Sequence, residues 1–592
     1  MPIPDRSTQR AVPHPSKAVF PTLMLLTLAG AGLRLWHLGD KPLWLDEVIA
    51  ALFSLGRRLE DVPLNQAFPL AQLETVFTYR PGLSCGQIAE TVATQSVHPP
   101  LFFCLMYRWM GWLEPYNNWV WALRALPALV GSLMVPLGYW LGQLAVSPQV
   151  GLTTAALITV SPFAVYLSQE ARHYTLPMVL IAIALALCLH LQQAISRGAR
   201  PWAVRGILGA WILVNGVGLY VHYFFLLTVT AQAIALTAWM GQRWRARLTI
   251  PAPPQMPVYL RDLFLSLLVI ALGYLPWLPT MLGHLSRPET DWLTPYNPDW
   301  RDRLAPLYQI PMGWILSVVA LPIETQPLAI AIPAAVAMLA VGALIGWSVG
   351  QGLWQLRHSA SIRLIAAFVA VVLLQFLAIV YVLDKDITAI PRYNFVYYPG
   401  LVILVAAGLT QSSATAPRSN SKFKSRWMRA PLAAALLAGT ISSLLVVNGW
   451  VFQKGFYPSR VAQDIAFEPG TPVLLSVSYQ SLQEVALGLS FARELRRHAQ
   501  GEAAIAFIYR EGGYGPVWRR FPQLRPDLPI PLNLWVVASP GMKTKDYPNR
   551  LRLRTQTSEQ ARCTIVPERF NRIGFPYQLF RCQSRRTQRS SS

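Results

Sequence analysis

Eleven apolar runs recur along this chain of 592 residues, and each is long enough to cross the ~30 Å hydrocarbon core of a bilayer. They lie at 18–36, 119–142, 150–168, 173–191, 206–221, 223–240, 262–282, 326–349, 362–383, 393–411 and 430–451. Hydrophobic residues make up 53% of the chain and charged residues only 13%, whereas a soluble domain carries roughly 25% charged residues. The runs therefore predict an all-α polytopic membrane protein with about eleven transmembrane helices.

Two further apolar runs, 99–113 and 305–323, are short or interrupted by polar residues, so length alone does not decide whether they cross. If neither crosses and the N-terminus is inside, the cytoplasmic segments hold 17 Lys and Arg with one acid. The opposite segments between the runs then hold 11 Lys and Arg with 16 acids. Cytoplasmic loops are the basic ones, so this topology is preferred, with the two short runs lying as interfacial helices.

The composition becomes globular at about residue 452. We expect a transmembrane module over 1–451, with a first outer loop at 37–118, and a C-terminal non-cytoplasmic accessory domain over 452–592. This tail is strongly basic, but long segments translocate largely regardless of charge. Short β-rich runs begin at 471, 503, 533 and 577, and a helix is expected at about 481–499. The pattern predicts a small α/β or α+β soluble domain.

Five cysteines in a chain of this size exclude a disulfide scaffold. Cys563 and Cys582 are the only two that we place together in a segment outside the cytoplasm, as one disulfide or as two free thiols. The net charge of +23 would suggest nucleic acid in a soluble chain. Here the basic residues lie mostly in short loops and in the tail, so membrane orientation explains the charge and no nucleic-acid partner is expected.

Ionisable residues are almost absent from the apolar runs. Arg34, Arg124 and Asp262 lie toward the ends of their runs. A transporter or proton pump places acids, bases or broken helices near the middle of the membrane, and the sequence shows no such pattern. No Gly-rich phosphate loop and no Cys/His cluster is visible either, so we assign no metal ligands.

Polar residues gather instead at the predicted outer ends of the runs. Trp44-Leu45-Asp46-Glu47 follows the first run and places two carboxylates at membrane level. They suit a general base, or simply acids at a helix N-terminus that interact with the helix dipole. Pro391-Arg392-Tyr393 opens a later run from the same side. Arg392 could bind an anion with its planar fork or extend its charge to the interface.

Two more polar groups lie at this edge. In Ser168-Gln169-Glu170-Ala171-Arg172-His173-Tyr174, a helical conformation puts Glu170 and Tyr174 on one face. The structural alternative is an ion pair that anchors a tight turn. Tyr220-Val221-His222-Tyr223 joins two runs with almost no loop between them, where a hydrogen-bonded interfacial histidine is the simpler interpretation. Taken together, the acids, histidine, arginines and tyrosines suit an amphiphile with an anionic headgroup.

Several motifs in this order carry a family resemblance. They are Asp46-Glu47, the His-Pro-Pro-Leu run from 98, LRALP at 123–127, SPFAVYLSQEARHY at 161–174, YVHYFFLL at 220–227, LPWLP at 275–279 and PRYNFVYYPGLVIL at 391–404. Over most of 18–411 the chain resembles the bacterial GT-C-fold glycosyltransferases, relatives of protein O-mannosyltransferases and of the lipid A aminoarabinose transferase. The resemblance does not extend to the tail.

The resemblance implies an inverting glycosyltransferase in the bacterial plasma (inner) membrane. It would move a sugar from a polyprenyl-phosphate-linked donor to a lipid, glycan or protein acceptor on the outer face. Membrane lipids and the donor are the expected partners, and the motifs do not identify the acceptor. No cofactor is implied. A divalent cation stays open, although arginines can stabilise the departing phosphate without one.

The resemblance also implies roles for particular residues. Asp46 matches the family's catalytic acid and Glu47 is its neighbour. His98 matches a basic position near the donor phosphate, which Arg172 and Arg392 would complete. Further substrate-binding residues are expected at Glu170, Tyr174, His222, Tyr223 and Tyr393.

Two other classes of function remain as alternatives. A lipid or glycan transporter would share the apolar runs and the basic outer tail, and intramembrane acids or inverted repeats would favour it. A non-catalytic scaffold whose basic tail binds anionic glycan or lipid would share the tail, and loss of the Asp46-Glu47 pair would favour it. The sequence shows neither kind of evidence.

Overall fold

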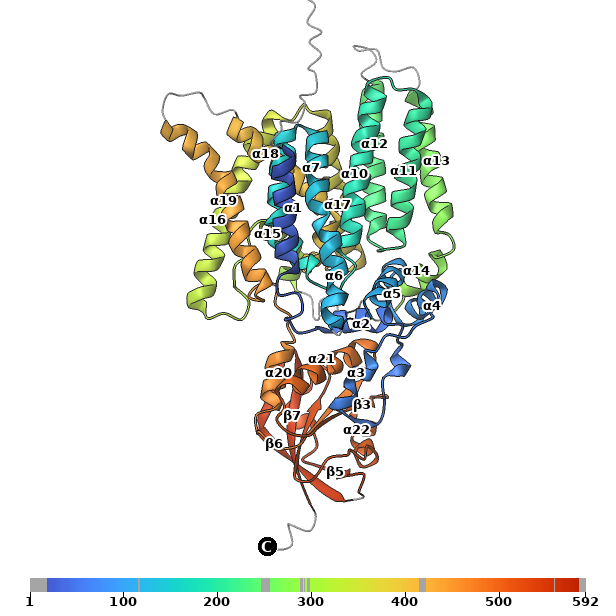
Figure 1. Cartoon of the computed structure of the whole chain (residues 1–592), viewed down its shortest axis with the longest axis vertical. Helices are drawn as coiled ribbons and strands as arrows, with labels where there is room; N and C mark the ends of the chain where they lie inside the picture. Colours follow the sequence, from blue (N-terminus) through green and yellow to red (C-terminus); the bar gives the residue numbers. More distant parts are fainter. Residues whose placement is uncertain are drawn as a thin grey trace, which may run out of the picture.

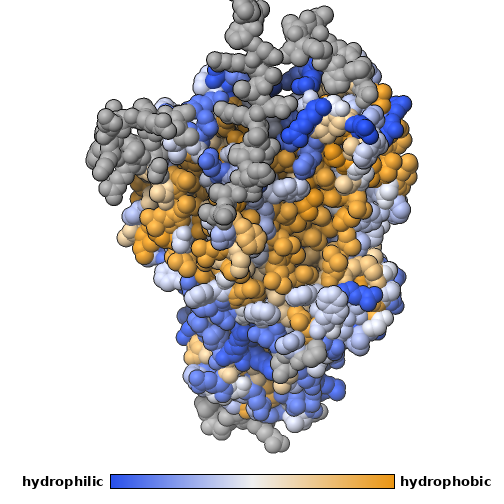
Figure 2. Space-filling view, turned by 45° about the horizontal axis from the view of Figure 1, so that its top comes forward, coloured by the Kyte–Doolittle hydropathy of each residue, from blue (hydrophilic) through white to orange (hydrophobic). Residues whose placement is uncertain are grey.

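The structure is a helical bundle that stands on a smaller domain built around a β-sheet (Figure 1). This computed structural model describes residues 19–114, 116, 118–245, 256–287, 291, 293–294, 299–414, 422–557 and 559–584. An apolar belt covers the bundle, while the smaller domain is mostly hydrophilic (Figure 2). The chain is a multi-pass membrane protein with a C-terminal mixed-sheet domain, so the predicted fold class is confirmed.

Helices occupy every predicted span. Eight described helices are long and apolar enough to cross a membrane. The first, Trp119–Ala145, consists of α6 (Trp119–Ser132) and α7 (Met134–Ala145). The others are α10 (Thr175–Ser196), α11 (Pro201–Leu219), α12 (Phe225–Arg245), α13 (Met256–Tyr274), α16 (Leu328–Gln355), α17 (Ala360–Leu383) and the part Ala430–Val447 of α19 (Lys422–Val447). The bent pair α8 (Pro148–Thr159) and α9 (Pro162–Ser168) makes nine when it is counted as one span.

The two predicted spans that remain, 18–36 and 393–411, contain helices of only 17 residues, α1 (Val19–Leu35) and α18 (Tyr398–Ala414). At 1.5 Å per residue each extends about 26 Å, slightly less than a hydrocarbon core. The expected count of eleven is therefore reached only if both short helices also cross.

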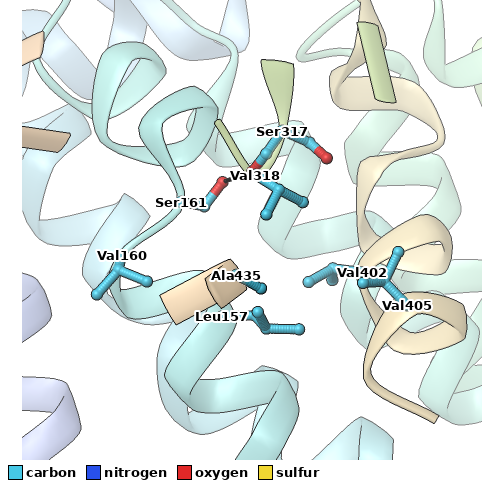
Figure 3. Close-up of a pocket in the computed structure, with 8 residues that line it drawn as sticks. All are labelled: Leu157, Val160, Ser161, Ser317, Val318, Val402, Val405 and Ala435. Atoms are coloured by element: carbon cyan, nitrogen blue, oxygen red, sulfur yellow. Dashed lines mark hydrogen bonds between the residues drawn. The ribbon is translucent and has the colours of Figure 1, made fainter. Parts of the chain in front are cut away.

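The break between α8 and α9 is stabilised locally. The Ser161 hydroxyl accepts a hydrogen bond from the Ala164 amide at 3.3 Å and donates one to the Ser317 carbonyl at 2.6 Å. Pro162 occupies the first turn of α9, where its missing N–H is tolerated. The two helices meet at 57°, beside a small apolar cavity that α18 and α19 also line (Figure 3). The Ser168–Tyr174 motif follows α9 directly.

The loops between the spans fall into two groups. Arg205 pairs with Asp262 at 2.9 Å, and Gln193 donates to the Leu144 carbonyl at 2.9 Å, which joins segments predicted to be cytoplasmic. Segments predicted to be outside meet at the other end of the bundle, where the C-terminal domain lies (Figure 1). The structure therefore supports the predicted grouping of the loops, while the orientation in the membrane stays a prediction. The expected cytoplasmic segment 1–17 lies outside the described residues.

The first outer loop folds into short helices against the end of the bundle. They are α2 (Leu45–Ser54), α3 (Leu73–Val76), α4 (Cys85–Gln95) and α5 (Leu101–Leu113). The 13 residues of α5 extend about 20 Å, too short to cross, so the 99–113 run packs against α2, α4 and α6 instead. The 305–323 run forms most of α15 (Trp300–Leu316), which Pro306 and Pro311 interrupt.

A disulfide joins Cys85 of α4 to Cys104 of α5. The expectation that only Cys563 and Cys582 share an outer segment was wrong, because both Cys85 and Cys104 lie in the 37–118 loop. Cys563 and Cys582 also form a disulfide, between facing positions of two strands. Cys188, in the membrane-spanning α10, is the one free cysteine and is buried.

The C-terminal domain contains a seven-stranded mixed sheet in the order β1-β3-β2-β4-β7-β6-β5. The strands are β1 (Ala67–Pro69), β2 (Val473–Tyr479), β3 (Ala503–Tyr509), β4 (Leu532–Val537), β5 (Arg550–Arg554), β6 (Gln560–Ile573) and β7 (Phe575–Ser584). Three helices accompany them, α20 (Pro458–Ile465), α21 (Leu482–His498) and α22 (Tyr514–Arg520). Four strands and α21 match the expected positions.

The first outer loop is built into this domain. Its strand β1 pairs antiparallel with β3 and closes one edge of the sheet. The helix α21 packs against α2, and the Ser490 hydroxyl donates to the Leu43 carbonyl just before α2. The C-terminal domain therefore holds the segment that carries Asp46 and Glu47. The division at residue 452 stays a prediction, because residues 67–69 belong to the sheet.

Candidate active site

Asp46 lies in the first turn of α2, at the junction of the bundle and the C-terminal domain. Its Oδ2 atom is 3.8 Å from Arg172 Nη2 and 3.6 Å from Arg392 Nη2. Arg172 Nη1 also donates to the Asp46 backbone carbonyl at 3.1 Å. Three residues that the sequence placed in separate motifs therefore form one charged cluster.

The arginines are held by aromatic faces. The Arg172 guanidinium lies 5.7 Å from the centre of the Tyr174 ring. The Arg392 guanidinium lies 5.2 Å from the Trp44 ring and 5.5 Å from the Tyr393 ring, and Arg392 begins the short 3-10 helix η5 (Pro391–Val396). Cation–π contacts of this kind fix a guanidinium without using its N–H donors.

Glu47 is engaged differently from Asp46. Arg124 of α6 donates to its two carboxylate oxygens from Nε at 2.8 Å and Nη2 at 2.7 Å, and the Ala171 amide donates at 2.8 Å. Burial alone would raise the pKa of Glu47, but Arg124 and the Ala171 N–H outweigh it and hold the pKa below its usual value. This ion pair links α2, α6 and the turn after α9, so we interpret Glu47 as a positioning residue.

Three histidines pack against one another beside the arginines, with tilted rings. The ring centres of His98 and His173 are 4.8 Å apart, and those of His173 and His222 are 4.6 Å apart. Burial and the nearby Arg172 lower the pKa of His98 well below its usual value, and they lower that of His222 to about 3. His98 is therefore neutral, with Nδ1 2.9 Å from the Ser96 hydroxyl. His98, which the resemblance assigns to a basic position near the donor phosphate, therefore lies beside Arg172 without a charge of its own.

His173 was missed as a candidate. It is buried between the other two histidines, and neither ring nitrogen has a hydrogen-bond partner in the described part of the chain. Tyr223 was expected at the site but lies in another network. Its hydroxyl is 2.6 Å from His284 Nδ1 and accepts from the Trp277 indole at 3.1 Å, beside α14 (Leu278–Leu285).

Glu170 forms a second charged group on the other side of Trp44. It pairs with Lys454, whose Nζ is 3.0 Å from the Tyr166 hydroxyl and 4.1 Å from the Trp44 ring centre. Burial raises the pKa of Glu170. Lys41 donates to the Gln169 side chain and to the Val446 carbonyl, each at 2.6 Å. Burial, followed by the charge of Arg124, lowers the pKa of Lys41 to about 7.

Lys41, Arg124 and Lys454 are site residues that were not expected at the site. Arg124 lies 77 positions from Glu47 in sequence, and Lys454 lies 288 positions from Tyr166. The local signals were the place of Arg124 within the LRALP motif and that of Lys41 five positions before Asp46, in a loop poor in lysine. Among the described residues no group of three or more His, Cys, Asp and Glu side chains is arranged to hold a metal ion.

Fold and site together define a multi-pass membrane protein with a carboxylate and two arginines at the junction with its extramembrane domain. No family model and no curated protein matches the sequence. Among solved structures, the chain is similar to ArnT from Cupriavidus metallidurans in the apo state, with a TM-score of 0.48 and 12% identity over 88% of this chain and 94% of that one. The same protein bound to undecaprenyl phosphate gives 0.45 and 13%, over 87% and 93%.

The chain is also similar to the archaeal oligosaccharyltransferase AglB from Archaeoglobus fulgidus, in complex with an inhibitory peptide and a dolichol-phosphate. The TM-score is 0.42 and the identity 12%, over 82% of this chain and 64% of that one. These similarities concern the course of the chain only, so the interpretation of the site rests on its own geometry.

Proposed function

We propose that the protein is an inverting glycosyltransferase that uses a polyprenyl-phosphate-linked sugar and works on the outer face of a bacterial plasma membrane. The observation that carries the proposal is the Asp46 carboxylate between the guanidinium groups of Arg172 and Arg392. All three lie where the helical bundle meets the C-terminal domain. A lipid donor can reach this level from the bilayer, and its phosphate matches the two guanidinium groups.

The reaction is a single displacement. Asp46 accepts the proton of the acceptor hydroxyl, whose oxygen forms a bond to C1 of the donor sugar. The bond between C1 and the phosphate oxygen breaks, and its electron pair leaves on the phosphate. Arg172 and Arg392 stabilise that charge as it develops. One displacement inverts the configuration at C1.

Arg172 retains a donor that this role needs. The two arginines lie 3.8 and 3.6 Å from Asp46, which exceeds hydrogen-bond length, so these contacts are charge pairs. Arg172 is buried, and its Nε atom lacks a hydrogen-bond partner within the described residues. A phosphate oxygen would satisfy this donor, which supports a binding role for Arg172 rather than a purely structural one.

No specific observation favours the transporter or the scaffold. Asp262, an acid in an apolar helix, is paired with Arg205 and Arg261 near one end of α13. It resembles an anchored helix end, whereas a translocation pathway would place an acid near the middle of the membrane.

The test is sugar transfer in nanodiscs from a polyprenyl-phosphate sugar, comparing wild type, Asp46→Asn and Asp40→Asn. Asp46→Asn keeps the size of the side chain but cannot accept the proton, so turnover should fall by roughly 100-fold or more while donor binding survives. Asp40→Asn, in the same loop, is the matched control and should keep its turnover. An Asp46→Asn protein with near wild-type turnover would remove Asp46 from the proposed chemistry.

A further inference from the structure

A cavity of about 370 Å³ lies between the bundle and the C-terminal domain. The end of α9, the loop before α2 and the segment joining α19 to α20 all contribute to its walls. Trp44 belongs both to this wall and to the contact with Arg392. The chemistry proposed above, centred on Asp46, leaves this cavity without a role.

The walls of the cavity combine aromatic rings with polar side chains. Trp44, Tyr166, Phe452 and Tyr457 supply the rings, and Tyr166 and Phe452 stack at 4.3 Å between ring centres. The side-chain amides of Gln169, Gln453 and Gln463 lie among them. A cavity of this size is at the small end of the ~300–1,000 Å³ typical of ligand sites. Flat apolar faces beside amides fit the alternating apolar and hydroxyl surfaces of a sugar ring.

The charge of the walls is positive. Four cations, Lys41, Arg124, Lys454 and Arg460, line the cavity together with the carboxylates of Glu47 and Glu170. Arg124 pairs with Glu47, and Lys454 pairs with Glu170. Among the described residues Lys41 and Arg460 have no carboxylate within ion-pair distance. Arg460 therefore adds an unpaired positive charge and Lys41, whose pKa burial lowers to about 7, adds a partial one, and this excess favours an anionic ligand.

Two buried polar atoms on the walls have no hydrogen-bond partner in the described structure. They are Glu170 Oε2 and Trp44 Nε1, in residues that are each 95% buried. Buried polar atoms are nearly always paired in folded proteins. The hydroxyls of a sugar both donate and accept, so they match both an unpaired carboxylate oxygen and an unpaired indole N–H.

The backbone of the wall is also unusual. Phe452 and Tyr457 have φ angles of 56° and 37°, in the left-handed region that side chains rarely adopt. Such conformations cost free energy and concentrate at binding and catalytic sites. Both residues direct the segment after α19 around the cavity, with Lys454 between them.

We infer that this cavity is the acceptor subsite and takes an anionic saccharide unit, meaning a sugar ring with a carboxylate or a phosphate group. The inference rests on the proposed transferase function. Trp44 lies two positions before Asp46, and its ring contacts both Lys454 and Arg392. A saccharide held against Trp44 therefore lies next to the proposed base and near Arg392.

The test is binding of small sugars to the full-length protein in nanodiscs by saturation-transfer NMR. The probes are glucuronic acid, glucose 6-phosphate, glucose and inorganic phosphate. Either acidic sugar should bind on the order of tenfold more tightly than glucose, as expected for one charge-assisted hydrogen bond. Whichever acid binds better identifies the charged group. Equal affinities for glucose and both acidic sugars, or for inorganic phosphate and glucose 6-phosphate, would overturn the inference.

Variants locate the bound sugar. Arg460→Ala changes an exposed side chain and leaves the buried walls intact, so a folding defect is not expected, and Lys41→Met tests the interior. Both should weaken binding of the acidic sugar at least fivefold. Lys385→Ala, at another ion pair on the same side of the bundle, is the matched control and should bind like wild type. If Arg392→Ala abolishes sugar binding while Arg460→Ala and Lys41→Met do not, the sugar occupies the donor site and the inference fails.

Binding of polyprenyl phosphate, measured in the same nanodiscs, separates the two proposals. Wild type that binds polyprenyl phosphate but no acidic sugar contradicts only the acceptor subsite. Wild type that binds no polyprenyl phosphate contradicts the proposed function, whatever the result with sugars. Arg460→Ala should retain polyprenyl phosphate while losing the acidic sugar.

Discussion

Replacing Glu47 by Gln tests whether the second acid of the pair acts through structure rather than through chemistry. The substitution removes the charge that compensates Arg124, a side chain that is 99% buried. Arg124 would retain the backbone carbonyls of Leu38, Lys41 and Pro42 and one neutral amide oxygen as acceptors, with no negative charge beside it. Breaking one partner of a buried ion pair typically costs about 3–5 kcal/mol, and we expect a loss of that size in the free energy of unfolding.

The measurement is unfolding by SDS titration in mixed micelles, together with sugar transfer per folded molecule. Asp291→Asn is the control, because Asp291 pairs with Lys385 at 2.9 Å but is 69% exposed. An exposed pair contributes at most about 1 kcal/mol. Adding Arg124→Met to Glu47→Gln removes the uncompensated charge and should recover part of the lost stability. Asp46→Asn should behave in the opposite way, with stability kept and turnover lost.

The result that would refute this reasoning is a Glu47→Gln protein as stable as wild type but unable to transfer sugar. Glu47 would then take part in the chemistry, and the base would be Glu47 instead of Asp46. A pH series adds an independent check. The folded-state pKa of Glu47 is below the ordinary value of 4.5, so the stability from this pair is present above pH 4.5. It is lost as the pH falls through the lower folded-state value.

Three further predictions follow from the site and the topology. Arg172→Lys keeps the charge but loses the planar guanidinium that binds phosphate through two N–H groups. The affinity for polyprenyl phosphate should therefore fall at least tenfold while expression is unchanged. Equal affinity would mean that Arg172 only anchors the end of its helix. Reporter fusions after residues 200, 420 and 592 should report inside, inside and outside. An inside signal from the last would mean that an interfacial run has been misassigned and that the outer-face site must be redrawn. His222 is neutral in the fold, with a pKa of about 3 against 6.5 when unfolded, so stability should fall as the pH drops from 6.5 toward 4. Thermal unfolding of wild type and His222→Gln measures this, and a wild-type curve with the same slope as the variant's would contradict the assignment.

The helices of the bundle were predictable because each apolar run is long and continuous. The tail was predictable where strands are apolar, and α21 (Leu482–His498) lies within a residue or two of the expected helix. Strand β5 was not predicted because three of its five residues, in the sequence RLRLR, are arginines and hide the alternating pattern of its two leucines. Its two leucines are buried, Arg550 and Arg552 are exposed and Arg554 is half-buried, which is the alternation of a strand with one solvated face. Strand β1 has only three residues and depends on partners far away in sequence.

The site was predictable only in part, for a physical reason. Asp46, Arg172 and Arg392 were each visible as polar residues at the end of an apolar run, and the fold brings such ends together. The partners of Glu47 and Glu170 were not visible, because Arg124 looked like a residue near a helix end and Lys454 like part of a basic tail. Tyr223 shares a motif with His222 but points to His284 instead. Which residues share an outer edge can be read from a sequence, but which of them touch cannot.

The pairing of the first outer loop with the C-terminal domain sets the order in which the protein can mature. The Leu43 carbonyl meets Ser490, 447 positions later, and Asn65 meets Tyr509, 444 positions later. At a synthesis rate of about 5–20 residues per second, roughly 20–90 s separate the two halves of these contacts. During that interval the helix that carries Asp46 packs against α4 and α5 but lacks its contact with α21. A chain that stops before α21 therefore inserts its spans while the segment before α2 lacks its hydrogen bond to Ser490.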